Sequence, residues 1–153
     1  MTMAPPTIHG TCVFWLGCGV LITGPSGGGK SQLALSLMGE PLDAAELVAD
    51  DRVIVKVKNK TVIGSAPAAL RGRIERFGMG IETHDVCSSA VIQLVVELVP
   101  RDKVERMPDP SNLFWQYDGI RVPKLVLPTQ PINPEASIRT ILSRAKPYSE
   151  EKA

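Results

Sequence analysis

A glycine-rich stretch near the start of the chain constrains the fold and the function more than any other segment. It fits the phosphate-binding P-loop pattern G-x-x-x-x-G-K-S/T, and its residues are Gly24, Pro25, Ser26, Gly27, Gly28, Gly29, Lys30 and Ser31. The apolar run 20–23 before it predicts a short buried strand. The run 32–38 after it is rich in helix formers and is closed by Gly39, which predicts a helix. The motif requires this order of strand, loop and helix, so the sequence predicts a nucleotide-binding site.

The residue types in this loop indicate how it holds a nucleotide. Glycines let backbone N–H groups approach phosphate oxygens, and the start of the following helix adds partial positive charge. We expect Lys30 to reach the β- and γ-phosphates of ATP, and the Ser31 hydroxyl to bind Mg²⁺. The alternative is a flexible Gly/Ser/Pro turn that contains a lysine by chance.

Length, charge and cysteine content narrow the class of protein. The chain has 153 residues, which suits one domain, and its formal net charge of +1 gives no reason to expect nucleic acid or an anionic membrane as partner. Its three cysteines, Cys12, Cys18 and Cys87, lack the spacing of metal ligands, so we expect reduced thiols in a cytoplasmic protein. The apolar run 12–22 is interrupted by glycines and continues into the loop, which argues against a signal peptide or a membrane span.

Two adjacent carboxylates, Asp50 and Asp51, follow the core-like run 46–49. A P-loop kinase needs an acidic group near the γ-phosphate to hold Mg²⁺, and a base or orienting group for the attacking hydroxyl. Neighbouring aspartates can divide these roles, because two like charges so close together do not behave alike. The alternative is a solvated acidic turn. His9 lies near the start of a strand that we expect to neighbour the loop, although a lone histidine is more often structural or merely exposed.

Alternation and turn residues predict the other strands. The run 91–99 is the longest uninterrupted β-like run, which predicts a central strand. Partial alternation on both sides of Asn59 and Lys60 predicts a hairpin over 52–64. The run 11–15 is predicted to pair, as a hairpin, with the strand that leads into the loop.

Two further helices are expected. One is a short helix over 66–73, and the other is the last helix of the chain, over 135–145. Asn133 and Pro134 have the residue types of an N-cap and a first helical position for the last helix. Recurrent prolines beyond Pro100 disfavour helix before the last one, so we expect short strands there, such as one over 122–127, and ordered loops.

Several separated segments, taken in order, resemble the catalytic domain of bacterial HPr kinase/phosphorylase, the serine kinase of the phosphocarrier protein HPr. The matching segments are Ile8-His9-Gly10, the glycine-rich loop, 47–51, 74–81, 105–107 and 122–128. The resemblance covers nearly the whole chain, in the form that lacks the family's N-terminal domain. It implies a single α/β domain with a P-loop and a mixed, strand-rich sheet, related to the nucleotide domain of phosphoenolpyruvate carboxykinase. We expect this domain over 8–146, between flexible tails at 1–7 and 147–153.

The resemblance also implies roles for individual residues. His9 matches an active-site histidine, and Arg106 matches an active-site arginine that neutralises charge on the transferring phosphoryl group. One of Asp50 and Asp51 accepts the proton of the substrate serine; we favour Asp51 for the proton and Asp50 for Mg²⁺. Glu75 matches a glutamate tied to Mg²⁺. The implied cofactors are ATP and Mg²⁺, the implied partner is an HPr-like phosphocarrier of a bacterial phosphotransferase system, and the implied assembly is a hexamer.

The sequence departs from the family pattern at two places. The usual Glu-Ile-Arg-Gly reads Glu-Arg-Phe-Gly here, so Phe77 stands at the arginine position. Either Arg76 or Arg73 substitutes from a shifted position, or the contact is absent. The basic Pro-Gly-Arg-Asn loop, associated with dephosphorylation, is replaced around 128–131. The reverse, phosphorylase reaction therefore stays open.

Two alternatives belong to other functional classes. One is a P-loop kinase of a small molecule, since fold alone does not fix the acceptor; such kinases usually carry a helical lid, and nothing between Pro100 and Pro134 predicts one. The other is a nucleotide-binding regulatory module without transfer chemistry. Phe77 is the best argument for the second alternative, and the otherwise intact set of candidate catalytic residues is the argument against it.

Overall fold

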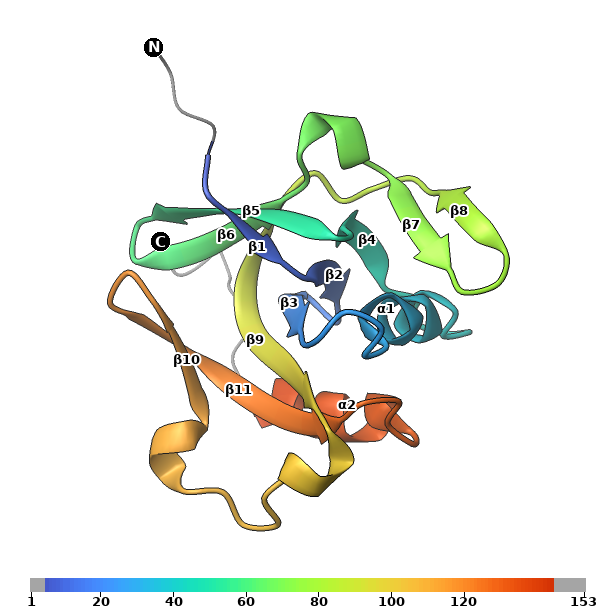
Figure 1. Cartoon of the computed structure of the whole chain (residues 1–153). Helices are drawn as coiled ribbons and strands as arrows, with labels where there is room; N and C mark the ends of the chain where they lie inside the picture. The colour runs from blue at the N-terminus through green and yellow to red at the C-terminus, as the bar shows by residue number, and fades with distance from the viewer. Residues whose placement is uncertain (1–4, 145–153) are drawn as a thin grey trace.

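The long strand β9 (Ala90–Val99) joins two parts of one mixed sheet in the computed structural model, which describes residues 5–144 (Figure 1). Near its start β9 pairs antiparallel with β6 (Thr61–Ser65), and near its end it pairs parallel with β11 (Ile120–Pro128). Its other edge pairs parallel with β3 (Cys18–Thr23). The prediction of a central strand over 91–99 is therefore confirmed.

The remaining strands extend this sheet on both sides. The order through the sheet is β1-β5-β6-β9-β3-β2-β4, and β10 pairs with β11. The bounds of these strands are Thr7–His9 for β1, Thr11–Trp15 for β2, Glu46–Ala49 for β4, Arg52–Lys58 for β5 and Phe114–Tyr117 for β10. The expectation of a mixed, strand-rich α/β sheet is confirmed, and β1 begins one residue before the expected start of the domain.

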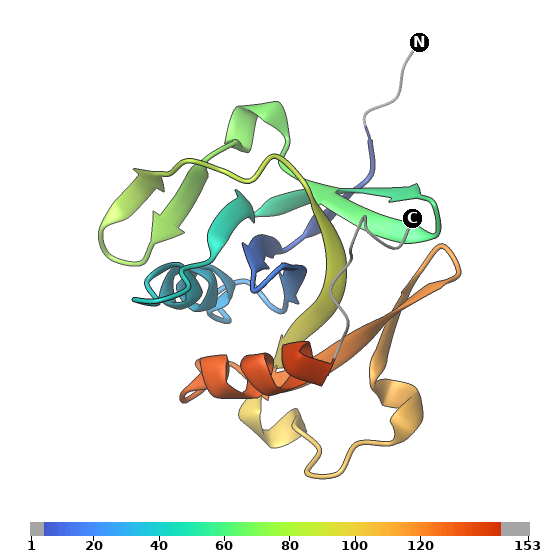
Figure 2. The same cartoon turned by 180° about the vertical axis from the view of Figure 1, so that it is seen from behind.

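Two helices pack on one side of the sheet. They are α1 (Lys30–Met38) and α2 (Pro134–Arg144), and Figure 2 shows α2 crossing the sheet in the view from behind. Strand side chains alternate between the faces of a sheet, so Ile22 of β3 joins both helices in one buried cluster while Leu21 joins a second cluster on the opposite face. Each fully buried side chain of this size contributes about 1.5–3 kcal/mol relative to an exposed one.

A separate two-stranded hairpin flanks α1. It consists of β7 (Arg73–Arg76) and β8 (Gly80–Thr83), which pair only with each other among the described strands, and Figure 1 shows it at the edge of the molecule. Ile74 anchors the hairpin, because its side chain is 1% exposed and belongs to the same cluster as the inner face of α1. The hairpin is thus attached at its base and free at its tip.

The predicted helix over 66–73 is wrong. Only a single 3₁₀ turn, Ala68–Leu70, forms there, and residue 73 already belongs to β7. Gly72 explains the early end: its φ is 77°, in the left-handed region, and a Cβ at this position would lie 2.8 Å from the carbonyl oxygen of His84. A helix cannot continue through that conformation.

The other local predictions hold. Asn59 and Lys60 have φ values of 52° and 62°, as a hairpin turn of the primed type requires, and they join β5 to β6. Pro134 is the first residue of α2, as predicted, and the expected end of that helix at Ala145 lies outside the described residues. Two short 3₁₀ turns, Arg101–Lys103 and Pro110–Asn112, occupy the proline-rich stretch. Neither described helix is long and apolar enough to cross a membrane.

Candidate functional site

The glycine-rich loop connects β3 to α1 through two conformations that require glycine. Gly24 has a φ of 152°, and a Cβ there would lie 2.9 Å from the carbonyl oxygen of Leu98 on β9. Gly29 immediately precedes α1 with φ 101° and ψ 17°, in the left-handed region. The predicted order of strand, loop and helix is therefore present. The loop and the N-terminus of α1 face the same region as a result.

Lys30 lies inside the loop that it terminates. Its side chain is almost fully buried, and its Nζ donates to the carbonyl oxygens of Gly24 and Pro25, at 3.0 and 2.8 Å. Burial lowers the pKa of Lys30, while the nearby charges of Asp50 and Asp51 act in the opposite direction. The ammonium group is thus held among polar acceptors that a phosphate oxygen can replace.

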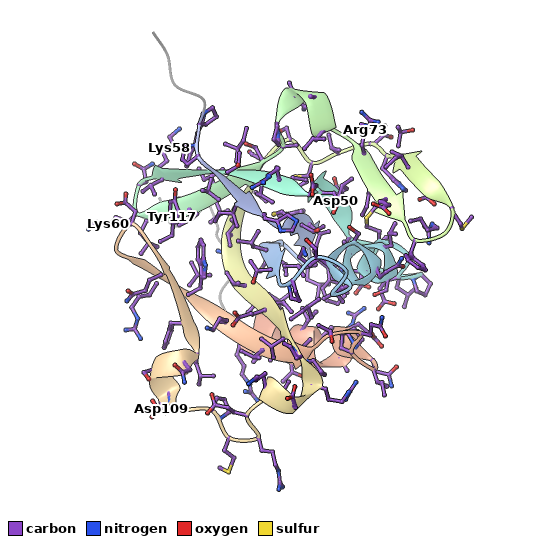
Figure 3. The ribbon with its side chains drawn as sticks, viewed as in Figure 1. Asp50, Lys58, Lys60, Arg73, Asp109 and Tyr117 are labelled. Atoms are coloured by element: carbon purple, nitrogen blue, oxygen red, sulfur yellow. The ribbon has the colours of Figure 1, made fainter. Side chains whose placement is uncertain are left out.

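The Asp50 carboxylate is the meeting point of four elements. Its Oδ1 accepts the hydroxyls of Thr11 on β2 and Ser31 on α1, both at 2.7 Å. Its Oδ2 accepts the backbone N–H of Glu75 on β7 at 3.3 Å. Asp50 itself follows β4 and is 7% exposed (Figure 3 labels it). A buried carboxylate needs such donors, because an unpaired charge away from water is costly.

Asp51 has a different environment from its neighbour. Its φ is 72°, a left-handed value that aspartate tolerates better than most residues, and its side chain is 65% exposed. His9 at the end of β1 lies beside it, with Nε2 3.5 Å from Oδ1 of Asp51. The register of β1 with β5 sets this pair, since His9 lies directly opposite Arg52. One aspartate is therefore fixed and buried, and the other is open to a reactant.

The structure brings His9, Lys30, Ser31, Asp50 and Asp51 to one end of the sheet. Glu75 is connected to this group through its backbone, while its side chain is exposed and has no hydrogen bond or ion pair among residues 5–144. Thus all of the predicted residues except one belong to or border a single site.

Arg106 is the exception. It is exposed, and within the part of the chain that the structure describes it makes no hydrogen bond or ion pair with the other candidate residues. It belongs to the segment between the two 3₁₀ turns, at the lower edge of Figure 1. In Figure 3, Asp109, three residues further on, lies well away from Asp50. The structure therefore does not bring Arg106 to the two aspartates.

The donor atoms near the loop suit a hard cation such as Mg²⁺. No cluster of three or more His, Cys, Asp or Glu side chains within residues 5–144 has the arrangement of a metal site. Mg²⁺ does not need one, because it is usually bound by one or two protein oxygens together with water and substrate phosphates. Oδ1 of Asp50 and Oγ of Ser31, 2.7 Å apart, form such an oxygen pair beside the loop.

Sequence reasoning missed one member of this site, Thr11. Its residue is fully buried, and its hydroxyl shares Oδ1 of Asp50 with Ser31. The only signal was a threonine at the start of an otherwise apolar run, and β-branched threonine is common in strands for its shape alone. Its partner lies 39 residues away in the chain, which local patterns do not reveal.

Comparison with known proteins decides the family. The family model described as HPr Serine kinase C-terminal domain matches residues 2–146. The chain belongs to this family. A similar relative is the HPr kinase/phosphorylase of Caldicellulosiruptor bescii, 41% identical in an alignment of length 139 that covers 82% of this chain and 42% of the relative. The HPr kinase/phosphorylase of Geobacter sulfurreducens is 33% identical in an alignment of length 148 that covers 90% of this chain and 45% of the relative.

A solved structure supports the same assignment. The Hpr(Ser) kinase/phosphatase from Coxiella burnetii matches with a TM-score of 0.74 and 32% identity, over 91% of this chain and 89% of that one. The chain spans less than half the length of the two curated relatives described above. The match covers the family's C-terminal domain, so the predicted family is confirmed.

Proposed function

We propose that this chain is an ATP- and Mg²⁺-dependent protein serine kinase that phosphorylates an HPr-type phosphocarrier of a bacterial phosphotransferase system. The observation that carries the proposal is the contrast between the two aspartates: Asp50 accepts three hydrogen bonds, whereas Asp51 is exposed beside His9. A kinase needs both an anchored acid near the phosphates and an accessible one near the acceptor. The proposal includes the P-loop role of the glycine-rich loop, the relation to the phosphoenolpyruvate carboxykinase nucleotide domain and the domain bounds 8–146.

In the proposed reaction Asp51 accepts the proton of the substrate serine. The serine oxygen then forms a bond to the γ-phosphorus of ATP, while the bond between that phosphorus and the bridging oxygen breaks and ADP leaves. His9, 3.5 Å from Asp51, orients the carboxylate and can share the accepted proton. Lys30 exchanges its two carbonyl acceptors for phosphate oxygens. Its positive charge stabilises the negative charge that develops on these oxygens.

Ser31 and Asp50 hold Mg²⁺ in this proposal, with Glu75 as a further ligand at the edge of the site. Bound there, the ion neutralises charge on the β- and γ-phosphates. The Thr11 hydroxyl and the Glu75 N–H keep the Asp50 carboxylate in one orientation. We propose that Arg106 reaches the phosphoryl group through movement of its loop, and that the protein acts in the cytoplasm, as a hexamer. The phosphorylase reaction is left to experiment.

The test is incubation of the protein with Mg·ATP and the HPr-type carrier of the same organism, with phosphoserine followed by mass spectrometry. We expect one phosphoserine per carrier, and no product with Lys30→Met. The same mixture, run backward from phosphorylated carrier and inorganic phosphate, measures the phosphorylase reaction. A folded wild-type protein that transfers phosphate to no carrier contradicts the proposal.

A nucleotide-binding module without transfer chemistry is the second candidate. The position of Arg106, without a hydrogen bond or ion pair to the site among the described residues, favours it. Calorimetric binding of Mg·ATP together with the absence of transfer to protein or metabolite acceptors identifies this case. Turnover of a metabolite and of no protein identifies a small-molecule kinase instead.

A further inference from the structure

The tip of the β7–β8 hairpin exposes three large apolar side chains. Phe77 is 82% exposed, Met79 is 76% exposed and Ile81 is 56% exposed. We name these three residues the apolar tip. Gly78 and Gly80 between them have left-handed φ values, and nothing lies within 4 Å of a Cβ built at either position. The tip is therefore open to solvent, and apolar side chains gathered in this way usually mark an interaction site.

The hairpin beneath the tip is firmly held. Ile74 is buried in the core against α1, and the Glu75 N–H donates to Asp50. Across the hairpin, Arg76 forms a bidentate ion pair with Glu82. An attached base under an unpacked tip is the arrangement of a docking element, because the partner does not have to order the backbone on binding.

The apolar tip adjoins the candidate catalytic acids. In the β7–β8 register Ile81 lies directly opposite Glu75, so the two Cα atoms are about 5 Å apart. The backbone of Glu75 in turn contacts the Asp50 carboxylate. Phe77 lies two residues beyond Glu75, and two residues of extended chain separate their Cα atoms by about 7 Å. A protein that places a hydroxyl beside Asp51 therefore also covers the apolar tip.

Basic side chains lie on one side of this surface, at the base of the hairpin and beside Asp51. Arg71 and Arg73 precede and begin the hairpin, both are exposed, and neither forms an ion pair within residues 5–144 (Arg73 is labelled in Figure 3). Arg52 follows Asp51 directly and is also exposed. Opposite charges around an apolar centre guide encounter and fix orientation. The surface thus fits a partner with an apolar patch that has acidic groups on one side of it.

We propose that the apolar tip docks the protein substrate, contacting an apolar patch beside the serine that is phosphorylated. This inference rests on the proposed function, and it adds how the acceptor is recognised. The exposure of Asp51 supports a macromolecular acceptor, since a small acceptor is usually enclosed away from water. Three such side chains cannot form a whole interface, but phenylalanine and methionine are enriched in protein interfaces relative to the rest of the surface.

The test compares Phe77→Ser and Met79→Ser with the control Val57→Ser. Val57 is another exposed apolar side chain, 40% exposed, and it precedes Lys58, which Figure 3 labels far from the hairpin. The HPr-type carrier of the same organism is the probe, and its Kd is measured by calorimetry alongside KM and kcat. We expect the two tip variants to raise Kd and KM for the carrier at least about tenfold, with the Kd for Mg·ATP unchanged and the control like wild type.

Each outcome is decisive. Tip variants that bind the carrier as tightly as wild type overturn the docking proposal and leave the proposed function intact. A wild-type protein that binds the carrier through the tip but transfers nothing supports docking and overturns the proposed function. A wild-type oligomer that dissociates in the tip variants, with unchanged carrier affinity, shows that a second copy of this chain covers the tip and also overturns the proposal.

Discussion

The Thr11 hydroxyl donates to Oδ1 of Asp50 at 2.7 Å, across 39 residues of sequence. The same oxygen accepts Ser31 from the start of α1, so two hydroxyls from different elements hold one carboxylate oxygen. This arrangement fixes the position of Asp50 before any nucleotide arrives. It also couples β2, a core strand, to the loop that we propose as the nucleotide site.

Replacement of Thr11 by valine should show how much this hydrogen bond contributes to the free energy of unfolding. Valine has nearly the same shape, so the buried volume is kept while one donor to a buried carboxylate is lost. We expect a loss of about 1.5–3 kcal/mol in the free energy of unfolding, measured by urea denaturation. Thr11→Ser keeps the hydroxyl and should recover most of the loss in hydrogen bonding. A valine variant as stable as wild type would show that Ser31 and the Glu75 N–H satisfy Asp50 by themselves.

Changing each of the two aspartates to asparagine should affect kcat and Mg·ATP binding differently. Asp51→Asn removes the proposed proton acceptor, so we expect kcat to fall by about 10²–10⁴-fold, with little change in the Kd for Mg·ATP. Asp50→Asn changes a proposed Mg²⁺ ligand that also accepts the Ser31 hydroxyl, so we expect weaker Mg·ATP binding as well. Calorimetry with and without Mg²⁺, beside steady-state kinetics, separates the two effects. Similar losses of Mg·ATP affinity in both variants would contradict this division of roles.

The parts of the site that could be predicted from sequence are those fixed by neighbouring residues. The glycine-rich loop, the strand before it and the helix after it follow from residue types within about twenty positions. The carboxylates were located because they end an apolar run. A short-range pattern carries each of these features.

The parts that escaped prediction depend on contacts between distant residues. Thr11 meets Asp50 only because β2 and β4 pair as neighbours in the sheet. The helix expected over 66–73 is replaced because Gly72 turns back toward His84, a contact that the local composition does not encode. The role of Arg106 stays a prediction. Its segment lies between two 3₁₀ turns, so no strand pairing fixes its position relative to the aspartates.

A close approach of two strands gives a test of the sheet that carries the loop. A Cβ at Gly19 would lie 2.4 Å from the carbonyl oxygen of Val91, where β3 pairs with β9. We expect Gly19→Ala to cost about 1–3 kcal/mol in unfolding free energy, because backbone on both sides must shift. Gly39→Ala is the matched control, since Gly39 has a φ of −90° and its nearest contact is at 3.4 Å. Equal stability of the two variants would contradict the close packing of β3 on β9.

The ion pair across the β7–β8 hairpin should make the hairpin sensitive to acid. Hydrogen bonding from Arg76, and then from His84, lowers the pKa of Glu82 from 4.5 to about 2. Because this pKa is lowered in the folded chain, the ionised carboxylate stabilises the hairpin at pH values above its unfolded pKa. That stabilisation is lost as the pH falls through about 2.

The measurement compares wild type with Glu82→Gln from pH 7 to pH 2. We expect the variant to show faster amide hydrogen exchange over residues 73–83 at neutral pH, because it lacks the ionised partner of Arg76. The difference should stay constant down to about pH 5 and then shrink toward zero as Glu82 of the wild type takes up its proton. Glu46→Gln, at an exposed carboxylate without an ion pair among the described residues, should show no such pH-dependent difference. If the Glu82 difference does not change between pH 5 and pH 2, the ion pair does not hold the hairpin.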